Sequence, residues 1–373
     1  MAQGKVNVYN KNLGQGSIPG VEKKFIFLGV GDGTTNKGAT LSLDSQSDLD
    51  VQLGETASEL KTILAAAQLN GGPDWEAKAH IIDAADGNYD ELFTIANAGV
   101  EAAVYTDAIE LTQVAMEAHQ TNTVQIKNTY KQPIFIIQVV EGINPATQTW
   151  AQYEAAVLAA TSALACDAVL AVPHLFDNNA DAGVLAGRLC RGDVSIADKP
   201  MRVMTGPTLG LGSRTVDSNG LAITDATLKA LDGLRLSVPQ TYVGKPGIYW
   251  GDANTFADPT SDYTVIENVR LANKVNRAIR ANSINKIADR SINSTPSSMA
   301  FNTNDYMKIL RSMSKTITFD GKTFPGECKT PEDGDITIVW TSRSKYVVYF
   351  KVRPYESAVE IEGNVFLDLS DPA

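Results

Sequence analysis

The sequence has little cysteine, little histidine and no long apolar run. Its three cysteines are few and widely spaced, so they do not indicate a disulfide framework: Cys166, Cys190 and Cys328. None of the three histidines stands at metal-ligand spacing from a cysteine or from another histidine. No stretch approaches the roughly 20 apolar residues that span a bilayer, and the first residues lack a signal-peptide pattern. We therefore expect no metal, no cofactor and no membrane insertion, and synthesis in a reducing cytoplasm.

The overall charge is acidic and excludes one further class of partner. The 373 residues carry a formal net charge of −11, and a field of that sign repels phosphate. We therefore expect no nucleic-acid partner. Hydrophobic content of 43% and charged content of 20% are typical of a folded globular protein of one large or two ordinary domains.

One segment reverses this charge. Between Tyr263 and Thr316 stand nine basic and three acidic residues, a net charge of +6. The pattern predicts a long helix over Tyr263–Ser291, with valines on one side and Arg270, Lys274 and Arg277 opposite. Arg280 falls nearer the apolar edge. A basic helical face indicates an acidic partner, although a surface helix with cations paired to carboxylates elsewhere would give the same pattern.

Helix and strand patterns alternate through the first two thirds of the chain. Strands are predicted at Lys24–Leu28, Ala77–Ala84, Val100–Tyr105, Pro133–Val140, Ala168–Val172, Arg202–Thr205 and Leu234–Val238. The intervening helices include Thr56–Leu69, Tyr89–Ala98, Ala108–His119, Thr149–Cys166, Ala180–Cys190 and Thr224–Leu231. This order predicts an α/β fold over residues 21–243, in which helices flank a mixed sheet.

The last third changes character and forms a predicted α+β region over residues 244–362. It begins with the apolar strand Gly247–Gly251 and continues with the basic helix. A second helix is predicted over Asn304–Thr316, and strands over Ile336–Thr341 and Tyr346–Val352.

Short strand patterns stand at both ends, in predicted arms over residues 1–20 and 363–373. The residues concerned are Lys5, Val6, Val8 and Tyr9 at the start, and Val365, Phe366, Leu367 and Leu369 at the end. Such runs are too short to form a sheet alone, and exposed strand edges are a hazard unless something pairs with them. They either pair with neighbouring subunits, pair within their own sheet, or fray.

Motifs for catalysis are weak. The glycine-rich turn Gly29–Gly33 follows a strand, but the residues after it lack the helical periodicity of a phosphate site. His174 and Asp177 follow a predicted strand, where α/β enzymes place functional groups. A cytosolic α/β enzyme that uses this pair is the alternative from another class.

Four segments, in this order, resemble the tail sheath proteins of contractile bacteriophage tails. Ser17–Val21 is similar to a Pro-Gly-Val entry, and Gly247–Gly251 to a strand that ends in Trp-Gly. Tyr263–Arg270 resembles the Tyr-x-x-Ile-x-x-x-Arg opening of the long sheath helix, and Val352–Ile361 the proline-led closing strand. The chain departs from the family after Trp-Gly, where Asp252-Ala253-Asn254-Thr255-Phe256 stands in place of the usual Ala-Arg-Thr-Leu, with an extra residue and without the arginine.

The resemblance implies a structural, non-enzymatic subunit. Six copies would form a ring around an inner tube, and stacked rings would contract to drive the tube through the bacterial envelope. The terminal arms would exchange strands between subunits, and Arg270, Lys274, Arg277 and Arg280 would contact the tube. The implied partners are further copies, the tail tube protein, and baseplate and tail terminator proteins. The implied location is the virion tail, assembled in the host bacterial cytoplasm. The sheath of a bacteriocin or another contractile injection system fits equally.

Overall fold

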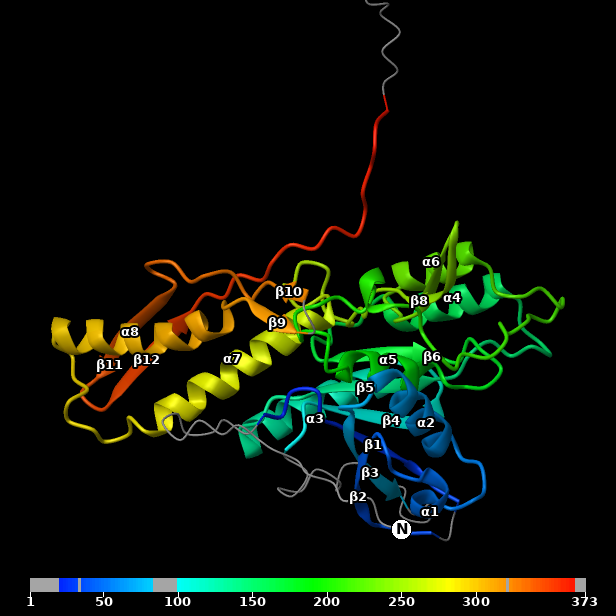
Figure 1. Ribbon diagram of the computed structural model, residues 1–373, viewed down its shortest axis with the longest axis horizontal. Coiled ribbons are helices and arrows are strands. Elements are labelled where there is room, and N and C mark those ends of the chain that lie inside the picture. The colour runs from blue at the N-terminus through cyan, green and yellow to red at the C-terminus, as the bar shows by residue number, and fades with distance from the viewer. Residues whose placement is uncertain (1–19, 33–34, 83–98, 320–321, 366–373) are drawn as a thin grey trace, which may run out of the picture.

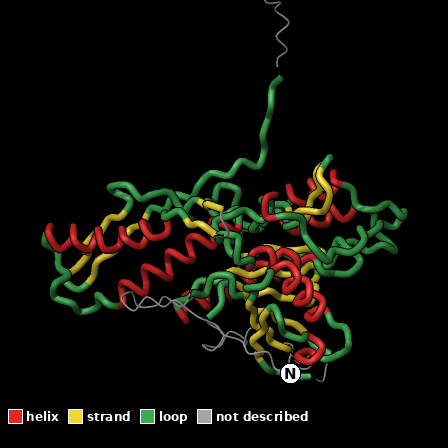
Figure 2. The backbone as a smooth tube through the Cα atoms, in the orientation of Figure 1, coloured by secondary structure: helices red, strands yellow, loops and turns green. Residues whose placement is uncertain are grey.

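The computed structural model describes residues 20–32, 35–82, 99–319 and 322–365 (Figures 1 and 2). The predicted arm strand at Lys5–Tyr9, the predicted helix Tyr89–Ala98 and residues 366–373 lie outside these ranges. The described chain forms a sheet with helices on both faces and, at its other end, a lobe built from two long helices and a β-hairpin. The α/β class and the later α+β region are both confirmed.

A six-stranded mixed sheet forms the larger lobe. Its strands are β1 (Phe25–Val30), β2 (Thr40–Asp44), β3 (Glu76–Ile82), β4 (Ala102–Ile109), β5 (Phe135–Val140) and β6 (Val169–Pro173). The order across the sheet is β2-β3-β1-β4-β5-β6, and only β2 runs antiparallel to its neighbour. The inner strands are apolar on both faces because helices cover both sides.

Six helices accompany this sheet: α1 (Leu49–Leu53), α2 (Glu59–Gly71), α3 (Gln113–Tyr130), α4 (Trp150–Thr161), α5 (Asp181–Cys190) and α6 (Asp225–Gly233). Successive residues of β1 face opposite layers, as the two-residue period of a strand requires. Phe25 and Phe27 pack in the core with α2 and α5, whereas Ile26 and Leu28 pack in a second core that includes Ile126 of α3.

The second lobe contains α7 (Ile266–Ile284), α8 (Pro296–Met313) and the antiparallel hairpin of β11 (Ile336–Ser342) and β12 (Lys345–Phe350). Two smaller hairpins, β7 (Pro239–Tyr242) with β8 (Lys245–Trp250) and β9 (Ile317–Phe319) with β10 (Lys322–Phe324), complete the described strands. Leu271 and Val275 of α7 share a core with Tyr306 and Leu310 of α8 and with Ile338 of the hairpin.

Two predicted strands are wrong, and a buried arginine explains the first. Residues Val203–Thr205 form a 3-10 helix instead of the strand predicted over Arg202–Thr205. The guanidinium of Arg188 donates hydrogen bonds to the carbonyls of Pro200, Arg202 and Gly206, so this loop curves around the cation. These three carbonyls are therefore not used for hydrogen bonds to a neighbouring strand. The chain over 234–238 is likewise irregular, and the next strand starts at Pro239.

The helices of the second lobe are displaced from their predicted ends. α7 stops at Ile284, not Ser291. α8 starts eight positions before the predicted Asn304, because Thr295 caps it and Pro296 takes its first turn. The Oγ1 atom of Thr295 accepts from the amide of Ser298, which satisfies one free donor of that turn.

Glycines in α5 allow it to lie unusually close to α2, which yields a first prediction. A Cβ atom at Gly187 would lie 2.4 Å from the carbonyl oxygen of Ala67. We expect Gly187→Ala to lower the free energy of unfolding by about 1–3 kcal/mol, measured by urea denaturation. The control is Gly233→Ala in α6, where a Cβ meets nothing within 4 Å. Equal stability of the two variants would contradict the close packing of α2 and α5.

Candidate assembly surfaces

The first candidate surface is the row of cations on α7, and its most prominent member is buried. Arg270 is 0% exposed. Its Nε and Nη2 atoms lie 2.7 and 2.8 Å from the two carboxylate oxygens of Glu101, at the entry to β4. The same carboxylate accepts the backbone N–H of Lys23 at 2.6 Å. Burial alone would raise the pKa of Glu101, but the charge and hydrogen bonds of Arg270 lower it below its ordinary value.

Two further cations of the row are also held inside the subunit. Arg277 is buried, with Nη2 3.0 Å from Glu22 Oε1 and Nη1 donating to the carbonyl of Pro133. The Nζ atom of Lys274 lies 2.6 Å from Glu327 Oε1. These pairs attach α7 to the chain just before β1 and to the loop before the hairpin.

The prediction of an exposed face formed by Arg270, Lys274 and Arg277 is therefore wrong. The apolar residues of α7 pack in the cores of both lobes, and Arg270 and Arg277 on its cation side are buried as well. The pairing to distant carboxylates that the sequence left open is what the structure shows. Arg280 is exposed, and it forms no ion pair with the described part of the chain. It remains available to a partner.

The second candidate surface is the hairpin of β11 and β12. One side of β12 packs inward: Tyr306 of α8 contacts the ring of Phe350, with centroids 5.4 Å apart, and its hydroxyl lies 3.2 Å from that of Tyr346. The other side is open, and Val339 and Tyr349 are 43% and 60% exposed. In the described chain the sheet has only these two strands, so both outer edges are unpaired.

The third candidate surface is the segment after β12, which is irregular and leaves the body of the subunit (Figures 1 and 2). Its root is fixed. The side chain of Arg353 forms ion pairs with Asp335 at 2.8 Å and with Glu332 at 2.9 Å. The carbonyl of Arg353 accepts a hydrogen bond from the amide of Lys329, and the side chain of Lys329 pairs with Glu356. Beyond the root the described chain is exposed, including three large apolar residues: Val359, Ile361 and Val365.

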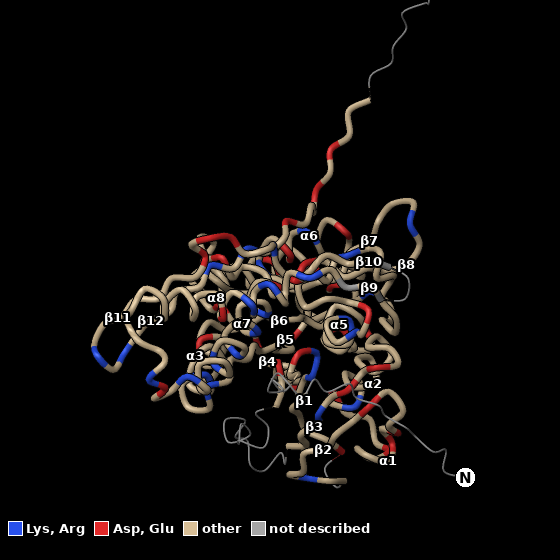
Figure 3. Tube along the Cα trace, turned by 60° about the vertical axis from the view of Figure 1, so that its left-hand side comes forward, with Lys and Arg blue, Asp and Glu red and all other residues tan. Residues whose placement is uncertain are grey.

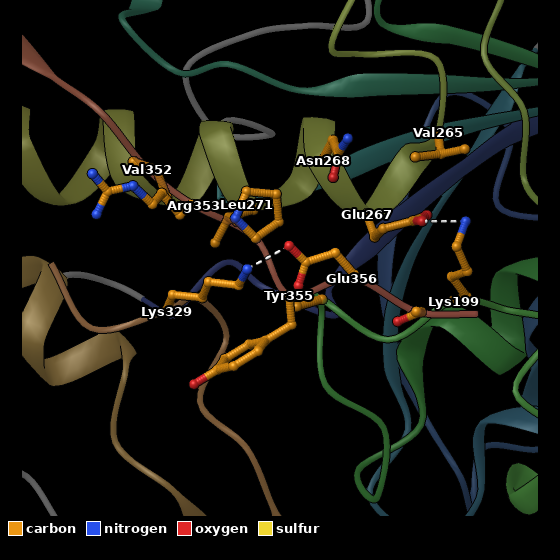
Figure 4. A pocket seen from close by; sticks show the side chains of 13 residues that line it. Lys199, Val265, Glu267, Asn268, Leu271, Lys329, Val352, Arg353, Tyr355 and Glu356 are labelled. Atoms are coloured by element: carbon orange, nitrogen blue, oxygen red, sulfur yellow. Dashed lines mark hydrogen bonds and ion pairs between the residues drawn. The ribbon is translucent and has the colours of Figure 1, made fainter.

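A cavity of about 520 Å³ separates this root from the first turn of α7 (Figure 4). On its wall the Nζ atom of Lys199 lies 2.8 Å from Glu267 Oε1, and 2.9 Å from Asp252 Oδ2. Lys199 therefore pairs with both carboxylates and connects the first turn of α7 to the loop at Lys199. The cavity lies at the boundary between the segment after β12 and the body of the subunit.

His174 and Asp177, the two residues of the enzyme alternative, have different surroundings. Burial lowers the pKa of His174 to about 4, so the ring is neutral at physiological pH. Asp177 accepts the amide of Ser213 at 2.8 Å, which fixes a loop. Among the described residues no group of His, Cys, Asp and Glu has a metal-binding arrangement, and no helix has both the length and the apolar character needed to cross a membrane.

Comparison with known proteins decides the family. Two family profiles match, the N-terminal domain of DUF2586 over residues 3–254 and its C-terminal domain over residues 262–370. The chain is 41% identical to the "Putative tail sheath protein" of Haemophilus phage HP1, over 98% of this chain and 97% of that protein. The chain belongs to the contractile tail sheath family.

Solved structures show the same fold. The sheath of an extracellular contractile injection system, PVC, in its contracted state has a TM-score of 0.63 at 16% identity, over 99% of both chains. The sheath tail protein of Desulfitobacterium hafniense has a TM-score of 0.55 at 9% identity, over 95% of this chain and 98% of that one.

Family membership confirms the resemblance to tail sheath proteins, although the structure shows no strand over Val352–Ile361, where the resemblance implied a closing strand. The protein is a structural subunit of a contractile tail sheath and a component of a virion tail, and it is not an enzyme. At the departure from the family pattern, Asn254 donates from Nδ2 to Asp232 Oδ1 at 2.9 Å.

The buried pair yields a second prediction. We expect Arg270→Met to reduce the free energy of unfolding by about 3–5 kcal/mol in urea denaturation, because Glu101 keeps a buried charge without its partner. The exposed control Arg280→Met should change it by less than about 0.5 kcal/mol. Adding Glu101→Leu to Arg270→Met should recover part of the loss, since it removes the orphaned charge. A double variant no more stable than the single one would contradict this account.

Proposed function

We propose that copies of this sheath subunit form hexameric rings stacked around an inner tube, joined by exchange of their terminal arms, and that contraction of the stack drives the tube through the bacterial envelope. The observation that carries the proposal is the segment after β12. It leaves the subunit as an extended chain whose Ile361 and Val365 are 86% and 89% exposed. Apolar side chains displayed in this way gain free energy only when another molecule covers them.

The hairpin of β11 and β12 is the surface that receives such a strand. A two-stranded sheet is marginally stable alone, and its open edges offer rows of backbone donors and acceptors. An added strand gains backbone hydrogen bonds without a matching pocket for every side chain. A joint of this kind stays connected while subunits rotate against each other. The N-terminal residues Lys5–Tyr9 are the second candidate for such a strand.

In this proposal Arg280 contacts the tube, together with Lys274 on the same helix, α7. Arg280 is exposed, and the side chain of Lys274 keeps 30% of its surface in contact with solvent. Exposed ion pairs contribute about 0–1 kcal/mol each and are screened by salt. Weak contacts repeated around each ring suit a sheath that releases its tube. Arg270 and Arg277 instead hold α7 in place, and α7 in turn presents Arg280 and Lys274.

The remaining partners in this proposal are baseplate and tail terminator proteins, with assembly in the host bacterial cytoplasm. The relative at 41% identity is a phage protein, which supports a phage tail over a bacteriocin. The injection-system sheath is more distant, at 16% identity.

Removal of Val365–Ala373 tests arm exchange. The truncated chain should keep its melting temperature, because the core of the second lobe is formed by residues up to Val352. It should form no tubes or rings in negative-stain microscopy. The control removes only the last three residues, Asp371–Ala373, and should assemble normally. Tubes from the longer truncation, at the protein concentration at which the full chain forms them, would refute the arm assignment.

Charge reversal at Arg280 tests tube contact. In co-sedimentation with purified tube protein, Arg280→Glu should weaken binding at low ionic strength and lose its effect at high salt. The matched control is Lys229→Glu on α6, an exposed lysine of the sheet lobe. If both variants bind tubes as the unaltered chain does at every ionic strength, Arg280 does not face the tube.

A further inference from the structure

The surface around α1 combines one exposed apolar side chain with acids. Val51 is 68% exposed. Residues 44–59 contain five acidic residues and no lysine or arginine. The Nζ atom of Lys61 pairs with Asp50 and donates to the carbonyl of Glu55 at 3.1 Å, which holds Glu55 beside α1. We call the exposed residues of this surface the acidic patch: Asp48, Asp50, Val51 and Glu55.

The end of α3 combines exposed apolar side chains with cations. Val124 and Tyr130 are 46% and 37% exposed. Lys127 follows Val124 by three positions, which places both on one face of the helix, and Lys131 is the C-cap. Residues 118–140 contain no acid, and both lysines are exposed without an ion pair to any described residue. These four residues form the basic patch.

The two patches lie on opposite faces of the sheet. Leu49 and Leu53 of α1 pack in the core that contains Phe27, whereas Ile126 of α3 packs in the core that contains Leu28. Successive residues of β1 face opposite layers, so these two cores lie on either side of the sheet. Figure 3 shows acids along the chain at α1 and cations along the chain at α3, at separate places on this lobe. One subunit therefore cannot bring its own two patches together.

The composition of the two patches fits a contact between two protein surfaces. Specific interfaces place apolar side chains at their centre and polar or charged side chains at their rim. Each patch has this composition, and the rim charges of the two patches are opposite in sign. Copies with a net charge of −11 repel each other in general, so a second copy approaches most easily where the surface is basic.

We propose that the acidic patch at α1 of one copy binds the basic patch at the end of α3 of a second copy. This rests on the ring assembly proposed above, and it adds which surfaces of the sheet lobe meet. Val51 then packs against Val124 and Tyr130, with the acids beside the two lysines. Two different patches on opposite faces make a head-to-tail contact, and such contacts build a ring or a helical array instead of a closed pair.

Two full-length variants test the charges of this contact. The first carries Lys127→Glu and Lys131→Glu, and the second Asp50→Lys and Glu55→Lys. Each alone brings like charges together, so we expect the critical concentration for polymerisation at low salt to rise about threefold to thirtyfold. An equimolar mixture should recover toward the unaltered chain, because alternation of the two variants restores opposite charges at every contact. The readouts are sedimentation and negative-stain microscopy.

A third variant tests the apolar centre. Val51→Ser should raise the critical concentration about threefold to tenfold, because the contact loses buried apolar surface. This rise should persist at high salt, whereas the effect of the charge variants should shrink. The matched control is Val114→Ser, since Val114 lies at the other end of α3, outside the basic patch, and is 77% exposed. The control should polymerise as the unaltered chain does.

Controls separate this inference from general charge effects. Lys229→Glu with Arg311→Glu makes the same charge change as the first variant on exposed positions of α6 and α8, and should polymerise normally. Circular dichroism melting checks each fold, and Glu55→Lys alone replaces the second variant if that variant melts early, since Asp50 pairs with Lys61.

The outcomes distinguish this contact from the proposed assembly. Normal polymerisation of both charge variants, or a mixture no better than its components, overturns the contact. If the first variant polymerises normally but loses binding to purified tube protein, the basic patch faces the tube and not a second copy. If the unaltered chain forms no rings or tubes, the proposed assembly itself fails, and this contact fails with it.

Discussion

The buried pair of Glu101 and Arg270 is the contact on which the arrangement of the two lobes depends. Burial of two charges costs several kcal/mol per ion, and their mutual attraction offsets that cost only when the geometry is good. Here the guanidinium meets both carboxylate oxygens, and the amide of Lys23 satisfies one of them again. Such a pair adds little net stability over an apolar contact. What it adds is a fixed position for α7 against β4, since any displacement leaves a buried charge without its partner.

This fixed helix connects the roots of the two arms. The chain that continues from the N-terminal arm passes Glu22, which binds Arg277 of α7. The chain that leads into the C-terminal arm is held by the lobe core to which Leu271 contributes, and by the pair of Lys274 with Glu327. A pull on either arm root therefore acts on the same helix. The cations of α7 therefore connect the residues before β1 and the loop before β11 within the subunit.

Periodicity was sufficient for the parts of this fold that local pattern determines. The buried strands β1 and β5 and the helix α5 lie close to their predicted ranges, because continuous apolar runs and a 3.6-residue period are local signals. The separation of valines and cations on α7 could also be predicted from the sequence. The burial of either side of the helix could not be predicted from it. The carboxylate that covers Arg270 lies 169 positions away, and a helical wheel contains no information about such a partner.

Buried and exposed charges form contacts of different persistence in this subunit. A pair such as Glu101 with Arg270 lies away from solvent, so salt screens it weakly and it persists while neighbours change. Exposed charges, such as Arg280 on α7 and Lys345 on the hairpin, are screened and exchange partners at low cost. In this chain the division follows burial: the same residue types that lock α7 inside the subunit become reversible contacts where they reach the surface.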